Sequence, residues 1–164
     1  MRSFKDNKGR EWQVELNVLA IRTVKDQVGV LLTGLFTDDA KPLAELTADP
    51  CKLVDVVWAL CSKQHEDVSD EEFATGLGGD ALGAATEALI RAVVDFFPSP
   101  AQRAGLHEYV DKLFEMSNVL AENAIGQLGQ YDLNRMAKTY LERVTSGLES
   151  QELTPPTGPS ENSA

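Results

Sequence analysis

Apolar and polar residues alternate over the first sixteen positions, which predicts a β-hairpin over residues 2–16. Trp12, Val14 and Leu16 recur at every second residue and are expected on one face, with Phe4 on the partner strand. Turn-forming residues separate the two runs. A two-stranded hairpin has little stability of its own, so this apolar face is expected to pack on helices.

From residue 17 to about residue 149 the apolar residues recur at a spacing of three and four, which is the period of an amphipathic helix. Asn17 is expected to cap the first helix and Gly29 to end it. The apolar run from Val30 to Phe36 is too short for its period to distinguish a strand from a helix, although a turn of helix is favoured. The expected helices cover residues 18–28, 43–46, 51–64, 70–77, 81–97, about 101–125 and about 133–148.

Several helix boundaries carry local signals. Ser69 and Glu72 have the spacing of a capping box, in which each side chain bonds a backbone N–H at the helix start. Asp80 is expected to cap the helix that follows a pair of glycines. Gly126 and Gly129 predict a break in the long helix that comes after the Pro-Ser-Pro turn.

The chain length and composition fit one globular domain. The 164 residues are 43% hydrophobic and 25% charged, and residues 1–150 are expected to form a single α+β, mainly α, domain in which the hairpin packs on a helical bundle. Residues 151–164 contain three prolines and almost no apolar residue, so a disordered tail is expected there.

The net charge of −11 argues against direct binding of nucleic acid, because such binding needs Lys and Arg to displace counterions from phosphates. Between Thr37 and Asp80 there are eleven acidic residues and three lysines. A solvated face that keeps the protein soluble explains this segment, and an acidic surface for a basic partner is the alternative. No apolar run approaches the length of a membrane helix, so a membrane partner is not expected.

The side chains that could carry chemistry have structural explanations. Cys51 and Cys61 flank an apolar helical run and are expected to be buried free thiols. His65 follows Cys61 by four residues, which allows a thiolate and imidazole pair, but a core thiol beside a surface histidine explains the spacing better. The glycines from Gly76 to Gly79 lack the lysine of a phosphate loop. No catalytic, metal or cofactor site is expected.

The apolar stripe of the last helices suggests a partner surface. An amphipathic helix with more apolar residues than a small core needs can dock onto another protein, although plain core packing remains the alternative. Tyr109, Phe114 and Met116 widen the stripe. Its candidate partner-binding residues are Leu106, Val110, Leu113, Leu120, Tyr140 and Val144.

Five segments, in this order, also support a resemblance to a known family. They are Phe4-Lys5-Asp6-Asn7-Lys8-Gly9-Arg10-Glu11-Trp12-Gln13-Val14, Leu53-Val54-Asp55-Val56-Val57-Trp58-Ala59-Leu60-Cys61, Ser69-Asp70-Glu71-Glu72-Phe73, Gly79-Asp80-Ala81-Leu82-Gly83-Ala84-Ala85-Thr86-Glu87-Ala88 and Asp95-Phe96-Phe97-Pro98. Together they resemble small tail proteins of long-tailed bacteriophages and prophages, the tail assembly chaperones. The resemblance covers residues 4–114.

The resemblance implies a non-enzymatic protein of the host bacterial cytoplasm that binds the tape-measure protein and assists assembly of tail tube protein around it. A homo-oligomer is compatible with such a role. Two other functions stay open, namely a structural tail or head-completion component retained in the virion, and a small enzyme or regulator that uses Cys61 and His65.

Overall fold

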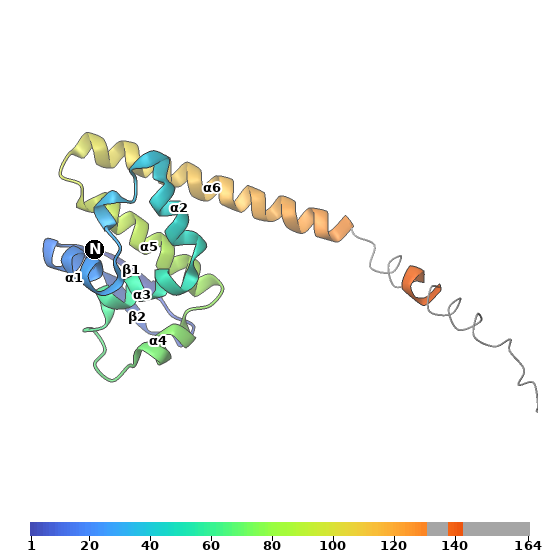
Figure 1. The fold of residues 1–164 in the computed structure, drawn as a ribbon, viewed down its shortest axis with the longest axis horizontal. Coiled ribbons are helices and arrows are strands. Elements are labelled where there is room, and N and C mark those ends of the chain that lie inside the picture. The colour runs from blue at the N-terminus through green and yellow to red at the C-terminus, as the bar shows by residue number, and fades with distance from the viewer. Residues whose placement is uncertain (131–137, 143–164) are drawn as a thin grey trace, which may run out of the picture. The chain divides into compact units, whose positions relative to one another are not determined.

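The structure is a computed structural model that describes residues 1–130 and 138–142 (Figure 1). The chain divides into two compact units, Met1–Phe114 and Glu115–Ala164. The single domain expected over residues 1–150 stays a prediction. The elements are β1 (Arg2–Lys5), β2 (Glu11–Val14), α1 (Val18–Val28), the 3-10 turns η1 (Leu32–Gly34) and η2 (Asp38–Ala40), α2 (Lys41–Ala48), α3 (Pro50–Cys61), α4 (Asp70–Gly76), α5 (Asp80–Phe96) and α6 (Pro100–Gln130). Residues 138–142 are also helical. The predicted class, mainly helical with an N-terminal hairpin, is confirmed.

The hairpin contributes large side chains to the core of the first unit. β1 and β2 pair antiparallel with Phe4 opposite Trp12, and both side chains are buried together with Val14. β1 packs on α5 and β2 packs on α3, at the left of Figure 1. The ring of Trp12 meets the ring of Phe73 from α4 edge to face, with 4.7 Å between the centroids. The period of two in the sequence therefore predicted the buried face of the hairpin.

α3 and α5 supply most of the helical core. Val56, Val57, Leu89 and Val93 are completely or almost completely buried. Burial of one such side chain stabilises the fold by roughly 1.5 to 3 kcal/mol relative to full exposure. The interior of the first unit is therefore apolar, and the one buried charged residue of the described chain is Asp6.

Asp6 organises the hairpin turn. Its carboxylate accepts hydrogen bonds from the backbone N–H groups of Lys8 and Arg10, from Arg10 Nε at 2.8 Å and from Trp12 Nε1 at 3.1 Å. Burial raises the pKa of Asp6, but these four hydrogen bonds outweigh it and lower the pKa to about 2. The turn is thus fixed by a buried carboxylate.

Ser69 begins α4 as predicted, but Glu72 does not close the capping box. Ser69 Oγ accepts from the backbone N–H of Glu72 at 3.1 Å. Glu72 Oε1 instead accepts from Lys8 Nζ at 3.1 Å and from Arg10 Nη1 at 2.7 Å. These two hydrogen bonds lower the pKa of Glu72. The carboxylate therefore joins α4 to the hairpin, because two cations there attract it more strongly than a backbone N–H does.

The start of α1 follows its local signals. Asn17 Oδ1 accepts from the backbone N–H of Ala20 at 2.9 Å, and Gly29 ends the helix with a φ of 76°. Val24 is buried on its inner face, whereas Val18 is exposed. The segment from Val30 to Phe36, left open by the sequence, contains the single turn η1.

Other helix boundaries differ from the prediction, and α2 extends over Lys41–Ala48 rather than residues 43–46. α3 ends at Cys61 rather than at Gln64, because the Gln64 amide bonds the backbone of β2. Gly79, with a φ of 55°, caps α5, and Asp80 is its first residue. α6 continues past Gly126 to Gln130, since a glycine in a helix interior costs only about 1 kcal/mol. The expected helix over residues 133–148 and the tail 151–164 lie outside the described residues, apart from residues 138–142.

Candidate docking surface

α6 begins in a rigid turn. Pro98 and Pro100 bracket Ser99, and the guanidinium of Arg103 donates to the carbonyl oxygens of Phe97 at 2.7 Å and Pro98 at 3.1 Å. The first bond satisfies the carbonyl group of Phe97, the C-cap of α5, and the second satisfies that of Pro98 in the turn before α6. The direction in which α6 starts is thereby fixed by the first unit itself.

Two polar contacts hold the first part of α6 on α5. Arg91 donates to Asp111 Oδ1 at 2.8 Å, and His107 Nε2 donates to Asp95 Oδ1 at 2.9 Å. Burial raises the pKa of Asp95, but hydrogen bonds from Arg2 and His107 outweigh it, so the pKa is lowered. One side of this part of α6 is therefore turned toward the core.

Three candidate partner-binding residues lie on this part of α6 and are not freely exposed. Val110 is completely buried. The alternative of plain core packing therefore applies to this residue, and it offers no surface for docking. Leu106 is half-buried and packs against the core. Leu113 is half-buried as well. Sequence spacing could not separate these positions from exposed ones, because the contacts of α6 with α5 decide which face turns inward.

In the second unit, Met116, Val119 and Leu120 form an apolar patch on α6. Their exposed fractions are 64%, 55% and 65%. A spacing of three and four places the three side chains on one face of the helix. This group is called the α6 patch below. Leu120 was a candidate from the sequence, whereas Val119 was missed although it follows Met116 by three residues.

The remaining two candidates lie further along the chain. Tyr140 is 70% exposed in the helical residues 138–142. Val144 lies outside the described residues. A docking role for Leu106, Leu113, Leu120 and Tyr140 stays a prediction.

Acidic side chains flank the α6 patch. Glu115 precedes it and Glu122 follows it in the sequence, and their spacing of seven residues places both along one side of the patch. Residues 115–123 contain neither Lys nor Arg. Both glutamates are exposed. A helix that brought Lys or Arg beside its own apolar stripe would find complementary charge here.

A hollow of about 360 Å³ lies in the first unit at the start of α6. Phe36, Asp39, Ala40, Leu106 and Tyr109 line it. The backbone of its edge is unusual, because the residues of η2 have φ values of 50°, 54° and 59°, the left-handed region. This conformation costs roughly 1 to 2 kcal/mol for Ala40, whereas Asp38 and Asp39 tolerate it better. The hollow is mainly apolar, and Asp39 adds a carboxylate to its lining.

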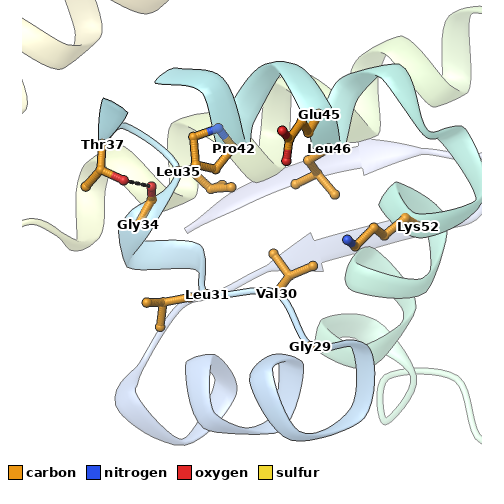
Figure 2. Close-up of a pocket in the computed structure, with 10 residues that line it drawn as sticks. All are labelled: Gly29, Val30, Leu31, Gly34, Leu35, Thr37, Pro42, Glu45, Leu46 and Lys52. Carbon is orange, nitrogen blue, oxygen red and sulfur yellow. Dashed lines mark hydrogen bonds between the residues drawn. The ribbon is translucent and has the colours of Figure 1, made fainter. Parts of the chain in front are cut away.

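A second hollow, of about 270 Å³, lies between α2, the first turn of α3 and the segment that follows α1 (Figure 2). Val30, Leu35 and Leu46 give it apolar walls, and Thr37 Oγ1 donates to the carbonyl oxygen of Gly34 at 2.7 Å. Figure 2 shows the amino end of Lys52 directed toward this hollow. The lining contains no histidine or cysteine, and its charged side chains are Glu45 and Lys52.

Cys61 and His65 do not form a reactive pair. Cys61 is buried and its thiol donates to the carbonyl oxygen of Gln13 at 3.2 Å. Burial raises the pKa of the thiol to about 12, so it is not a thiolate at neutral pH. His65 Nε2 donates to the carbonyl oxygen of Glu11 at 3.1 Å. The expectation that both cysteines are buried is wrong for Cys51, which is exposed, since it follows Pro50 in the first turn of α3.

Other candidate chemistry is limited in the part of the chain that the structure describes. The glycines from Gly76 to Gly79 end α4 and cap α5, as expected of a helix break. No group of three or more potential metal ligands lies together in residues 1–130 and 138–142. None of the helices described there combines the length and apolar character needed to cross a membrane.

Comparison of the chain with protein families, curated proteins and solved structures gives no significant match.

Proposed function

We propose that this protein is a non-enzymatic tail assembly chaperone of the long-tailed bacteriophage type, which binds a helical segment of the tape-measure protein and assists assembly of tail tube protein around it in the host cytoplasm. The observation that carries the proposal is the α6 patch. Three large apolar side chains on one helical face are more than half exposed. Such a face is the usual contact of helix-on-helix recognition.

The charge of the protein supports the same function. A chaperone for a long apolar helix must keep the complex soluble, and a net charge of −11 resists aggregation. The glutamates beside the α6 patch favour a client with basic residues flanking its apolar stripe. The Cys61 thiol, with its raised pKa, gives no support to a thiolate enzyme.

The genes on either side of the coding sequence give the first test. A tail tube gene before it and a very long tape-measure gene after it are expected, whereas a metabolic neighbourhood contradicts the proposal. Mass spectrometry of purified virions separates this function from that of a structural component, because a chaperone is absent from the finished particle and a structural component is present in stoichiometric amount.

Co-expression gives the direct test. The tape-measure candidate is expected to be insoluble alone and soluble together with this protein. Substitution of Leu120→Asp places a charge in the α6 patch and is expected to abolish this rescue, with no effect on folding because the side chain is exposed.

Asn118→Asp is the matched control. It adds the same charge at an exposed position on another face of the same helix, and it is expected to keep full rescue. Equal rescue by the Leu120→Asp and wild-type proteins would show that the α6 patch does not bind the client.

A further inference from the structure

The outer edge of β2 is covered. Gln13 donates its backbone N–H to Gln64 Oε1 at 2.8 Å, and its carbonyl oxygen accepts from Gln64 Nε2 and Cys61 Sγ. The Glu11 carbonyl oxygen accepts from His65 Nε2. Side chains at and after the end of α3 thus occupy backbone groups that an added strand would otherwise use.

The outer edge of β1 is open. In an antiparallel pair, residues that bond across the ladder alternate with residues whose N–H and C=O point outward. The backbone N–H of Asp6 donates to the carbonyl oxygen of Arg10 at 3.0 Å. Phe4 and Arg2, two and four residues earlier, therefore also bond across to β2. Ser3 and Lys5 therefore point their backbone groups away from β2. Both residues are exposed, and neither has a backbone hydrogen-bond partner among the residues described.

A hollow of about 260 Å³ adjoins this open edge. Arg2 and Ser3 of β1 line one side, and Ala84 and Ala88 of α5 line the other with Glu87 and Arg91. The alanines leave room for a side chain of medium size. A strand added to β1 would direct alternate side chains to the inner face, where α5 lies, and the others to the face that carries Ser3 and Lys5.

The charges at this edge indicate which strand fits. Three of the four cations of the hairpin are already paired, since Arg2 contacts Asp95, Lys8 contacts Glu72, and Arg10 contacts Asp6 and Glu72. Lys5 has no ion pair in the described structure. A carboxylate opposite Lys5 on an added strand would therefore gain a cross-strand partner.

We propose that the open edge of β1 binds an extended segment of another protein by strand addition. The segment alternates, with a carboxylate opposite Lys5 and an apolar side chain over Ala84 and Ala88. A second copy of this chain fits less well, because its β1 offers no carboxylate to Lys5 and two proteins of net charge −11 would be brought together. This surface is separate from the α6 patch and does not depend on the chaperone proposal.

The probe is an acetylated six-residue peptide of alternating Glu and Val, titrated into the 15N-labelled full chain at about 0.15 M ionic strength to limit long-range repulsion. The amide signals of Ser3 and Lys5 are expected to shift and their exchange with solvent to slow. A peptide of alternating Lys and Val is expected to bind at least about threefold more weakly, since it places like charge opposite Lys5.

Ser3→Pro is the sharpest variant. It removes an outward N–H without removing a bond to β2, and an edge strand tolerates proline at such a position. It is expected to weaken peptide binding at least about tenfold, because strand addition depends on main-chain bonds. Ser3→Thr keeps the N–H and is the matched control, with unchanged binding. Lys5→Glu serves if Ser3→Pro fails to fold, and it is expected to reverse the preference between the two peptides.

Three results would overturn the proposal. They are an absence of change at the Ser3 and Lys5 amides, unchanged binding by the folded Ser3→Pro protein, and unchanged peptide preference in the Lys5→Glu protein. Light scattering can give a fourth such result. If the protein self-associates and Ser3→Pro abolishes this association, a second copy of the chain occupies the edge instead.

Discussion

Replacement of Asp6 by Asn tests the physical account of the hairpin turn. The substitution keeps the shape of the side chain but removes the charge that the guanidinium of Arg10 and three other donors contact. The pKa of Asp6 falls from 3.8 to about 2 on folding. At about 1.36 kcal/mol per pKa unit, this difference corresponds to roughly 2.5 kcal/mol of stability at neutral pH.

The sign of the pH dependence follows from the lowered pKa. A carboxylate whose pKa is lowered on folding contributes its full stabilisation above the unfolded value of 3.8, and the contribution is lost as the pH falls through about 2. Asp6→Asn is therefore expected to lose about 2 to 3 kcal/mol of unfolding free energy at pH 7. The gap between the two proteins should narrow steadily between about pH 5 and about pH 2.

Urea denaturation followed by tryptophan fluorescence measures this gap at several pH values. Trp12 and Trp58 both lie in the first unit, so the signal reports the unit that contains Asp6. Glu45→Gln is the matched control, because Glu45 takes part in an exposed ion pair with Lys41 and should contribute at most about 1 kcal/mol. A gap below about 0.5 kcal/mol at pH 7, or a gap that does not change with pH, would refute the reasoning.

Two further predictions concern packing and thiol chemistry. Gly76→Ala would bring a Cβ to 3.3 Å from Asp6 Oδ2 and is expected to destabilise the first unit by about 1 to 2 kcal/mol. The Cβ of Gly83→Ala meets no atom within 4 Å, and this substitution is expected to stabilise α5 by about 0.5 to 1 kcal/mol. Urea denaturation measures both changes. Equal effects of the two substitutions would contradict the close contact at Gly76. A thiol-reactive dye is expected to label Cys51 rapidly in the native protein and Cys61 only after unfolding. Absorbance of the dye counts the labelled thiols. Rapid labelling of both cysteines in the native protein would contradict the burial of Cys61.

Local signals in the sequence predicted local structure well. Asn17 and Ser69 cap their helices because a cap depends on residues two or three positions away, which the sequence places beside it. The period of two likewise predicted which hairpin side chains are buried, because the pleat alone decides the face. The mainly helical class followed from the same short-range patterns.

Long-range partners could not be predicted in this way. Glu72 has the sequence position of a capping-box residue, yet its carboxylate bonds Lys8 and Arg10, which are more than sixty positions away in the chain. Gln64 leaves α3 to pair with Gln13 for the same kind of reason. A polar side chain with two possible partners bonds the one that attracts it more strongly, and only the folded structure shows which partner that is.

The candidate docking residues divide along the same line. Helical spacing placed Val110 and Leu120 in one stripe, although Val110 is buried and Leu120 is exposed. The contacts of His107 and Asp111 with α5 determine the difference. The left-handed residues of η2 had no clear signal either, beyond the tolerance of Asp for that region.

The unequal edges of the hairpin set a limit on self-assembly. Growth of an aggregate through strand edges needs two adhesive edges on each molecule, so that every new subunit offers a site to the next. Here the amide of Gln64 and the ring of His65 close one edge, and only β1 remains open. Two molecules that met through this hairpin would each use up the single open edge. Association by this route would end at a pair, and a fibre could not propagate from it.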